Sequence, residues 1–127
     1  MYLLINTSAK DSISLTLFKG SFVEQKSYSA VNRDLLLSIN SFLEVNKLSV
    51  QAIKGLVVVV GTGSFTSTRI ATTVANTWAY SEKIPILAVG VKEITDLVSL
   101  EEKISQSSVG ILILAIYSAE PNIGKKK

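Results

Sequence analysis

The sequence predicts one α/β domain built on a mixed five-stranded sheet with flanking helices. Three observations predict it: short apolar runs fill residues 2–28, apolar residues recur at helical spacing over residues 32–47, and residues 56–60 form a continuous, mostly β-branched run. A period of two indicates strands and a period of about 3.6 indicates a helix, so both kinds of element are expected. A chain of 127 residues is also of ordinary length for one domain.

The first three expected strands lie at residues 2–6, 12–18 and 21–28. In the second of them apolar and polar residues alternate, as in a strand with one buried face. Lys19 and Gly20 supply the tight turn between the last two. The three strands should therefore form an antiparallel meander.

The pattern changes period after the meander. A first helix is expected at residues 32–47, where Asn32 is available as its N-cap. Residues 56–60 follow as a strand buried on both faces of a parallel sheet, because no polar residue interrupts them before Gly61.

The second half of the chain continues the alternation of helix and strand. Thr66 or Ser67 can cap a second helix that runs to about Glu82, and Pro85 precedes a further strand. The remaining expected elements, in chain order, are a strand at 86–89, a short helix at 92–98 and a strand at 110–117.

The order of these elements points to a known architecture. Three meandering strands followed by helix, strand, helix and strand is the order of a ribonuclease H-like lobe, as used by the actin, hexokinase and Hsp70 superfamily. We expect this lobe to occupy residues 1–108. Residues 109–127 would then hold a remnant strand and a basic tail, so that the C-terminal part is shortened.

Composition limits the available chemistry. The chain has no histidine and no cysteine, so the usual general bases, thiol nucleophiles and zinc ligands are missing. Its net charge of +3 includes three terminal lysines, which leaves the body near neutrality and without a nucleic-acid footprint. No apolar run approaches the roughly 18 residues of a membrane span, and no signal peptide is recognisable. We therefore expect a cytoplasmic protein without a catalytic, metal or cofactor site.

A glycine-rich loop joins the fourth strand to the second helix and invites comparison with phosphate sites. A Walker A loop needs a lysine before its hydroxyl residue, and the dinucleotide fingerprint needs a third glycine near the place of Ser67. Neither pattern is met. The loop suits a sharp strand-to-helix turn, to which we assign Gly61, Gly63, Ser64, Phe65 and Thr66.

Asn6 closes the first strand where nucleotide-binding members of the superfamily carry a metal-binding aspartate. A neutral amide is a poor ligand for magnesium, so metal-dependent phosphoryl transfer loses its main electrostatic support. The segment Asn6-Thr7-Ser8 is better explained as a turn closed by hydrogen bonds from side chain to backbone.

The first helix carries more apolar surface than packing on one sheet needs. Its apolar residues from Val31 to Leu43 cover about 140° of the circumference, and Val45 widens this arc to roughly half. Such a surplus predicts a protein partner. The alternative is that the extra apolar residues pack on one another and on the C-terminal segment.

The second helix shows two neighbouring stripes. Ile70, Val74 and Trp78 form a large apolar stripe that we expect to face the sheet. The other stripe, expected to face outward and admit another helix closely, consists of small residues: Thr68, Thr72, Ala75 and Ala79.

Three segments together resemble the bacterial TsaB (YeaZ) family of tRNA threonylcarbamoyladenosine biosynthesis proteins. They are Leu3-Leu4-Ile5-Asn6-Thr7-Ser8, the run from Val59 through Gly61-Thr62-Gly63-Ser64-Phe65-Thr66-Ser67-Thr68-Arg69 to Ile70, and Ile84-Pro85-Ile86. The resemblance runs from the first strand to about Val98. The family usually has aspartate at the place of Asn6, and it normally adds a second C-terminal lobe.

The resemblance implies a non-catalytic scaffold. Family members support the related subunit TsaD, which transfers threonylcarbamoyl to the tRNA adenosine beside the anticodon, and the ATPase TsaE joins that assembly. They meet TsaD through their first two helices, and homodimers also occur. Contact with tRNA would be indirect, because TsaD acts on the tRNA. The resemblance and the helix surfaces together select these partner-binding residues: Leu36, Leu43, Thr68, Arg69, Thr72, Ala75, Asn76 and Ala79.

Two other functions stay open from the sequence. One is a kinase-like lobe that binds a nucleotide, and the other is a self-associating remnant without a modifying partner.

Overall fold

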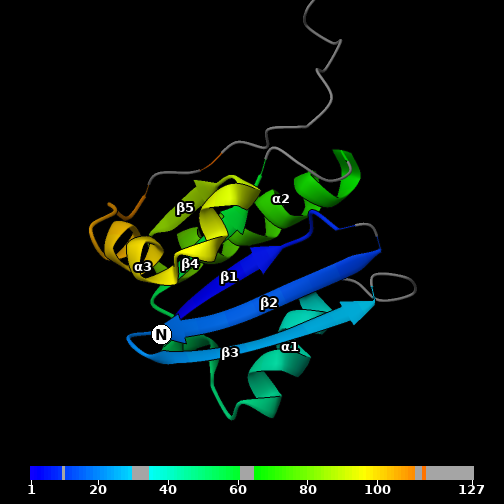
Figure 1. Cartoon of the computed structure of the whole chain (residues 1–127), viewed down its shortest axis with the longest axis horizontal. Helices are drawn as coiled ribbons and strands as arrows, with labels where there is room; N and C mark the ends of the chain where they lie inside the picture. Colours follow the sequence, from blue (N-terminus) through cyan, green and yellow to red (C-terminus); the bar gives the residue numbers. More distant parts are fainter. Residues whose placement is uncertain (10, 30–34, 61–64, 111–112, 114–127) are drawn as a thin grey trace, which may run out of the picture.

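The computed structural model describes residues 1–9, 11–29, 35–60, 65–110 and 113, and for residues 65–68 it describes the backbone alone. Five strands form one mixed sheet in the order β3-β2-β1-β4-β5 (Figure 1). The strands are β1 (Tyr2–Asn6), β2 (Ser12–Lys19), β3 (Phe22–Ser29), β4 (Gly55–Val59) and β5 (Ile86–Val89). The predicted five-stranded α/β architecture is therefore confirmed.

The expected antiparallel meander is present at one side of the sheet. Strand β1 pairs with β2 from Tyr2 opposite Phe18, and β2 pairs with β3 as far as Lys19 opposite Phe22. The connecting turn holds Gly20 at a φ of +60°, a conformation that glycine adopts without steric cost.

The other side of the sheet is parallel. Strand β4 pairs in parallel with both β1 and β5, and all five of its residues are buried. A strand covered on both faces needs no polar residue, which is why its sequence shows no alternation. The prediction of a central buried strand is confirmed, with its start one residue earlier than expected.

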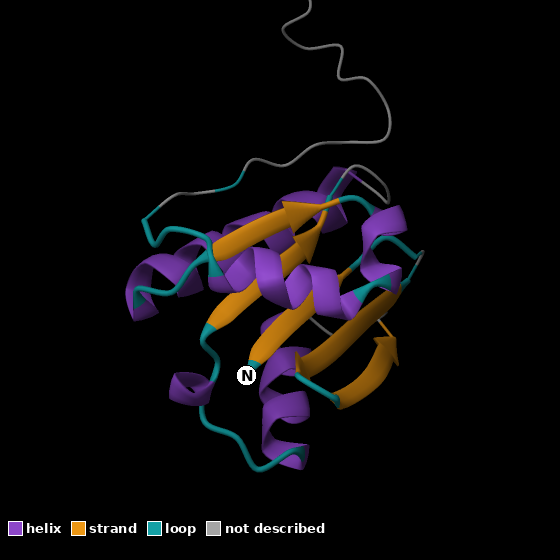
Figure 2. Ribbon diagram, turned by 60° about the vertical axis from the view of Figure 1, so that its left-hand side comes forward, coloured by secondary structure: helices purple, strands orange, loops and turns teal. Residues whose placement is uncertain are grey.

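Helices cover both faces of the sheet (Figure 2). One face packs against α1 (Leu35–Val45) and α2 (Phe65–Glu82), and the other against α3 (Leu97–Ser105). The pleat explains this division, because Leu3 and Ile5 of β1 contribute to the core under α1 and α2, whereas Leu4 contributes to the core under α3. Among the helices described, none has the length and apolar character that a membrane span requires.

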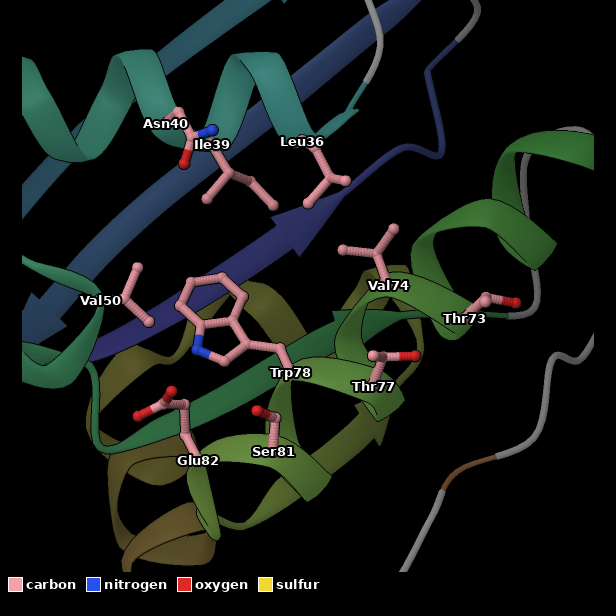
Figure 3. A pocket seen from close by; sticks show the side chains of 10 residues that line it. All are labelled: Leu36, Ile39, Asn40, Val50, Thr73, Val74, Thr77, Trp78, Ser81 and Glu82. Atoms are coloured by element: carbon pink, nitrogen blue, oxygen red, sulfur yellow. The ribbon is translucent and has the colours of Figure 1, made fainter.

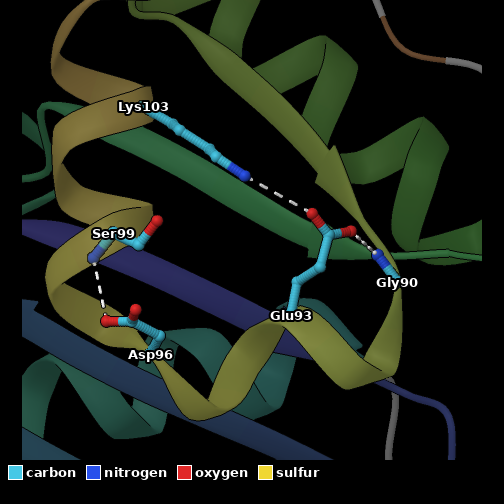
Figure 4. Close-up of polar contacts among 5 residues, drawn as sticks. All are labelled: Gly90, Glu93, Asp96, Ser99 and Lys103. Carbon is cyan, nitrogen blue, oxygen red and sulfur yellow. Dashed lines mark hydrogen bonds and ion pairs between the residues drawn. The ribbon is translucent and has the colours of Figure 1, made fainter.

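The bounds predicted for a short helix at residues 92–98 are wrong. A 3₁₀ segment, η2 (Val91–Thr95), is followed by α3, which continues to Ser105. The reason is a cap: Asp96 Oδ1 accepts a hydrogen bond from the Ser99 backbone N–H at 3.1 Å, so a new helix begins there (Figure 4).

A carboxylate ties these two segments together. Glu93 Oε1 accepts a hydrogen bond of 2.7 Å from the Gly90 backbone N–H, and its Oε2 lies 3.6 Å from Lys103 Nζ on α3 (Figure 4). Both side chains of the ion pair are about half exposed, so the pair contributes little free energy to the contact between η2 and α3.

Several expectations fall at the edges of the described chain. Helix α2 begins at Phe65, so Thr66 and Ser67 lie inside its first turn and do not cap it. Asn32 and most of the strand expected at 110–117 lie outside the described residues. Gly110 itself lies in a turn with a φ of +96°.

The predicted orientation of α2 is wrong. Ala71 and Ala75 are fully buried and Thr72 is nearly so, whereas Ile70 on the expected sheet-facing stripe is 47% exposed. The small residues face inward because they let the helix backbone lie close to the β-branched side chains of the sheet. The large residues are displaced to the flank of the helix.

Candidate functional site

A groove of about 400 Å³ lies between α1 and α2 (Figure 3). Its apolar lining is Leu36, Ile39, Val50, Val74 and Trp78. Its polar lining is Asn40, Thr73, Thr77, Ser81 and Glu82. Val50 comes from a 3₁₀ turn, η1 (Val50–Ala52), which lies at the end of the groove nearest Trp78 (Figure 3).

The groove follows from the surplus apolar surface of the two helices. Helix α1 buries Ile39 and Phe42 among other residues, but its apolar arc is wider than its contact and leaves Leu36 56% exposed. On α2 the inward alanines place Val74 and Trp78 on the flank that faces α1. Figure 3 shows Leu36 and Val74 facing each other at one end, with Trp78 toward the other.

Trp78 gives the groove a polar requirement. Its Nε1 atom is buried and has no hydrogen-bond partner among the described residues. A buried indole N–H normally finds an acceptor, so this donor marks an unfinished contact. Glu82, one helical turn further along α2, lines the same end of the groove.

The residues selected for partner binding fall into different places. Leu36 lines the groove and Arg69 is exposed at the start of α2. Four others are buried in the core, namely Leu43, Thr72, Ala75 and Ala79. The side chain of Thr68 lies outside the described part. The outward orientation predicted for Thr72 and Ala75 is therefore wrong, since both are buried.

The sequence reasoning missed most of the groove. It assigned Val74 and Trp78 to the sheet and gave no role to Val50 or Ser81. One signal was available: every fourth residue from Ala71 to Ala79 is alanine, and such a stripe suits the close approach of a helix to a sheet as well as to a helix.

Asn76, also selected for a partner, is engaged within the chain. Its Nδ2 donates to the Ile113 carbonyl oxygen and its Oδ1 accepts from the Ile113 backbone N–H, both at 2.9 Å. The carboxamide thus satisfies both backbone groups of one residue. Ile113 also packs against the core cluster under α1 and α2.

We expect Asn76→Ala to release Ile113, since two hydrogen bonds of roughly 1 kcal/mol each are lost. Deuterium exchange of the Ile113 amide should quicken about tenfold or more. Thr77→Ala, at the exposed next position, is the matched control and should leave that rate unchanged. Equal exchange in both variants would show that packing alone holds Ile113.

The turn expected after β1 is confirmed. Asn6 Oδ1 accepts hydrogen bonds from the Ser8 backbone N–H at 2.9 Å and from Ser8 Oγ at 2.6 Å. The amide is thus occupied in closing the turn. Of the glycine-rich turn, Gly61, Gly63 and Ser64 lie outside the described residues, while the backbone of Phe65 and Thr66 opens α2. The described residues include no cluster of three metal-ligating side chains.

The strand order and the helices on both faces define an α/β lobe of the ribonuclease H-like class. Among solved structures the chain is similar to YeaZ from Pseudomonas aeruginosa, with a TM-score of 0.63 and 23% identity, covering 80% of this chain and 50% of that one. It is also similar to an uncharacterized protein with similarity to peptidase YEAZ from Pseudomonas aeruginosa, with a TM-score of 0.59 and 24% identity, covering 71% and 44%. No family model and no curated protein matches the sequence.

These likenesses confirm at the level of the fold the relation to YeaZ that the sequence predicts. The chain spans about half the length of these two structures, with 50% and 44% of them covered.

Proposed function

We propose that this chain is a non-catalytic scaffold subunit. In this proposal it binds a TsaD-type partner through the groove between α1 and α2, and it thereby supports threonylcarbamoyl modification of the tRNA adenosine beside the anticodon. The observation that carries the proposal is the groove itself, an apolar cleft of about 400 Å³ open between two helices. The YeaZ-like fold and the sequence resemblance support the choice of partner.

The surface around the groove suits a protein better than a small polar ligand. Leu36, which lines the groove on α1, is 56% exposed, and Ile70, one turn before Val74 on α2, is 47% exposed. Fully burying an exposed leucine or isoleucine contributes roughly 1.5–3 kcal/mol, and about half of that remains to be gained at a side chain that is half exposed. A partner helix laid along the groove would recover it.

The chemistry in this proposal belongs to the partner. This chain has neither histidine nor cysteine, and its Asn6 amide closes a turn where a metal-binding carboxylate would stand. TsaD would perform the transfer and contact the tRNA, and TsaE would join the same assembly.

A matched pair of leucines tests the groove. Leu36 and Leu37 are neighbours on α1 and similarly exposed, at 56% and 51%, but only Leu36 lines the groove. We expect Leu36→Asp to weaken association with the TsaD homologue at least tenfold, because a carboxylate would be buried in an apolar contact. Leu37→Asp should bind nearly as the parent does.

The measurement is isothermal titration of the purified partner, with a melting curve of each variant. Both variants should keep the parent melting temperature, since neither residue is in the core. If Leu36→Asp binds as tightly as Leu37→Asp, the partner uses another face. If the parent chain shows no binding at all, the scaffold role is wrong.

A further inference from the structure

The charges around the groove are unevenly placed. Of the described residues that line it, Glu82 alone is charged, and it is the last residue of α2. The unpaired carbonyl groups at a helix C-terminus add partial negative charge there. Helix α1 carries one charged residue, Glu44, which is also acidic. The groove therefore has a largely apolar lining and one end that carries negative charge.

Trp78 strengthens the preference of that end for a cation. Figure 3 shows its indole and the Glu82 side chain reaching from successive turns of α2 toward Val50. An indole face attracts an ammonium or guanidinium group, and a nearby carboxylate neutralises it. The ring face and the carboxylate together would suit a basic side chain at the edge of an apolar cleft, whereas the Nε1 donor needs an acceptor that a cation does not supply.

We propose that the groove selects a helix of a different protein, one that places an apolar side chain between Leu36 and Val74 and a lysine or arginine against Glu82 and Trp78. This rests on the proposed function and adds the chemistry of the docking segment. Specificity then comes from the charge, because the apolar contacts alone would accept many helices.

None of the described residues that line the groove is a lysine or arginine, so the same lining on a second copy of this chain supplies no cation. A two-fold contact places the same patch against itself, so the two copies of Glu82 would lie in one interface. Arg69 is about 180° from Trp78 around the helix at about 100° per residue, on the opposite side of α2. Lys83 is not among the described residues that line the groove and lines a second hollow with Tyr80 and Val109, which shares Ser81 with the groove. Self-pairing through the groove is therefore disfavoured by like charge.

Charge reversal tests the inference. Glu82→Lys should weaken association with the TsaD homologue at least tenfold more than Glu44→Lys, which makes the same charge change outside the groove lining. The difference should shrink as salt is raised from about 0.05 M to about 0.5 M. Glu82→Gln should fall between parent and reversal. Melting curves should be alike, since neither carboxylate is in the core.

The outcomes separate this inference from the proposed function. Equal binding of Glu82→Lys and Glu44→Lys, with Leu36→Asp still impaired, overturns the basic-residue site and leaves the groove as the interface. Absence of binding by the parent chain refutes the proposed function itself. Analytical ultracentrifugation tests self-association, and the parent chain should sediment as a monomer. If the parent instead forms a dimer that is lost in Leu36→Asp and retained in Leu37→Asp, the groove binds a second copy and not a different protein.

Discussion

Ala75→Arg is expected to unfold this domain. Ala75 has no exposed surface and lies on the face of α2 that packs against β4. An arginine there would bury a charge without a counter-charge and would push the helix from the sheet. The cost is several kcal/mol, comparable with the roughly 5–15 kcal/mol that stabilise a domain. Circular dichroism at 25 °C should show loss of helical signal, or a melting transition lowered by many degrees.

Tyr80→Arg is the control for this prediction. Tyr80 lies on the same helix, is 77% exposed and is absent from the groove lining, so the same new side chain should leave the melting curve almost unchanged. A folded Ala75→Arg with parent-like melting would show that the alanine stripe faces outward, as the sequence alone had indicated.

The strands were predictable because their signals are local. Lys19 and Gly20 mark a turn whose positive φ the structure shows, and the uninterrupted apolar run of β4 is what a strand covered on both sides requires. Each of these features depends on residues within one element or between two neighbours.

The orientation of α2 was not predictable in the same way. A helix with one large and one small apolar stripe can bury either, and the choice depends on how closely the sheet allows the helix to approach. Ala71 and Ala75 share their core cluster with Leu56 and Val58 of β4, so the small stripe gives the denser packing there. The bounds of the helix expected at residues 92–98 were wrong for another reason: nothing in the sequence distinguishes Asp96, which caps α3 through its bond to Ser99, from a surface carboxylate.

The candidate groove contains residues that could be predicted from the sequence and residues that could not. Leu36 could be selected because the apolar arc of α1 exceeds what one sheet contact uses. Val50 and Glu82 could not, since they are 32 residues apart in sequence and meet only where η1, α1 and α2 converge. Neither residue belongs to a periodic pattern that would mark it as part of a site.

Phe42→Ala tests how α1 is held in place to form the groove. Phe42 is 1% exposed and is among the largest fully buried side chains, in the core beneath α1 and α2. Truncating a buried phenylalanine costs roughly 3–5 kcal/mol through lost burial and the cavity left behind. We expect the free energy of unfolding in urea to fall by that amount at an unchanged m-value, with Val45→Ala, at a position 66% exposed, as the control.

Because α1 supplies Leu36 and Ile39 to the groove, partner binding should weaken with the stability of that helix. A loss of less than about 1 kcal/mol would show that other contacts, such as those of Leu35 and Leu43, hold α1 against the sheet.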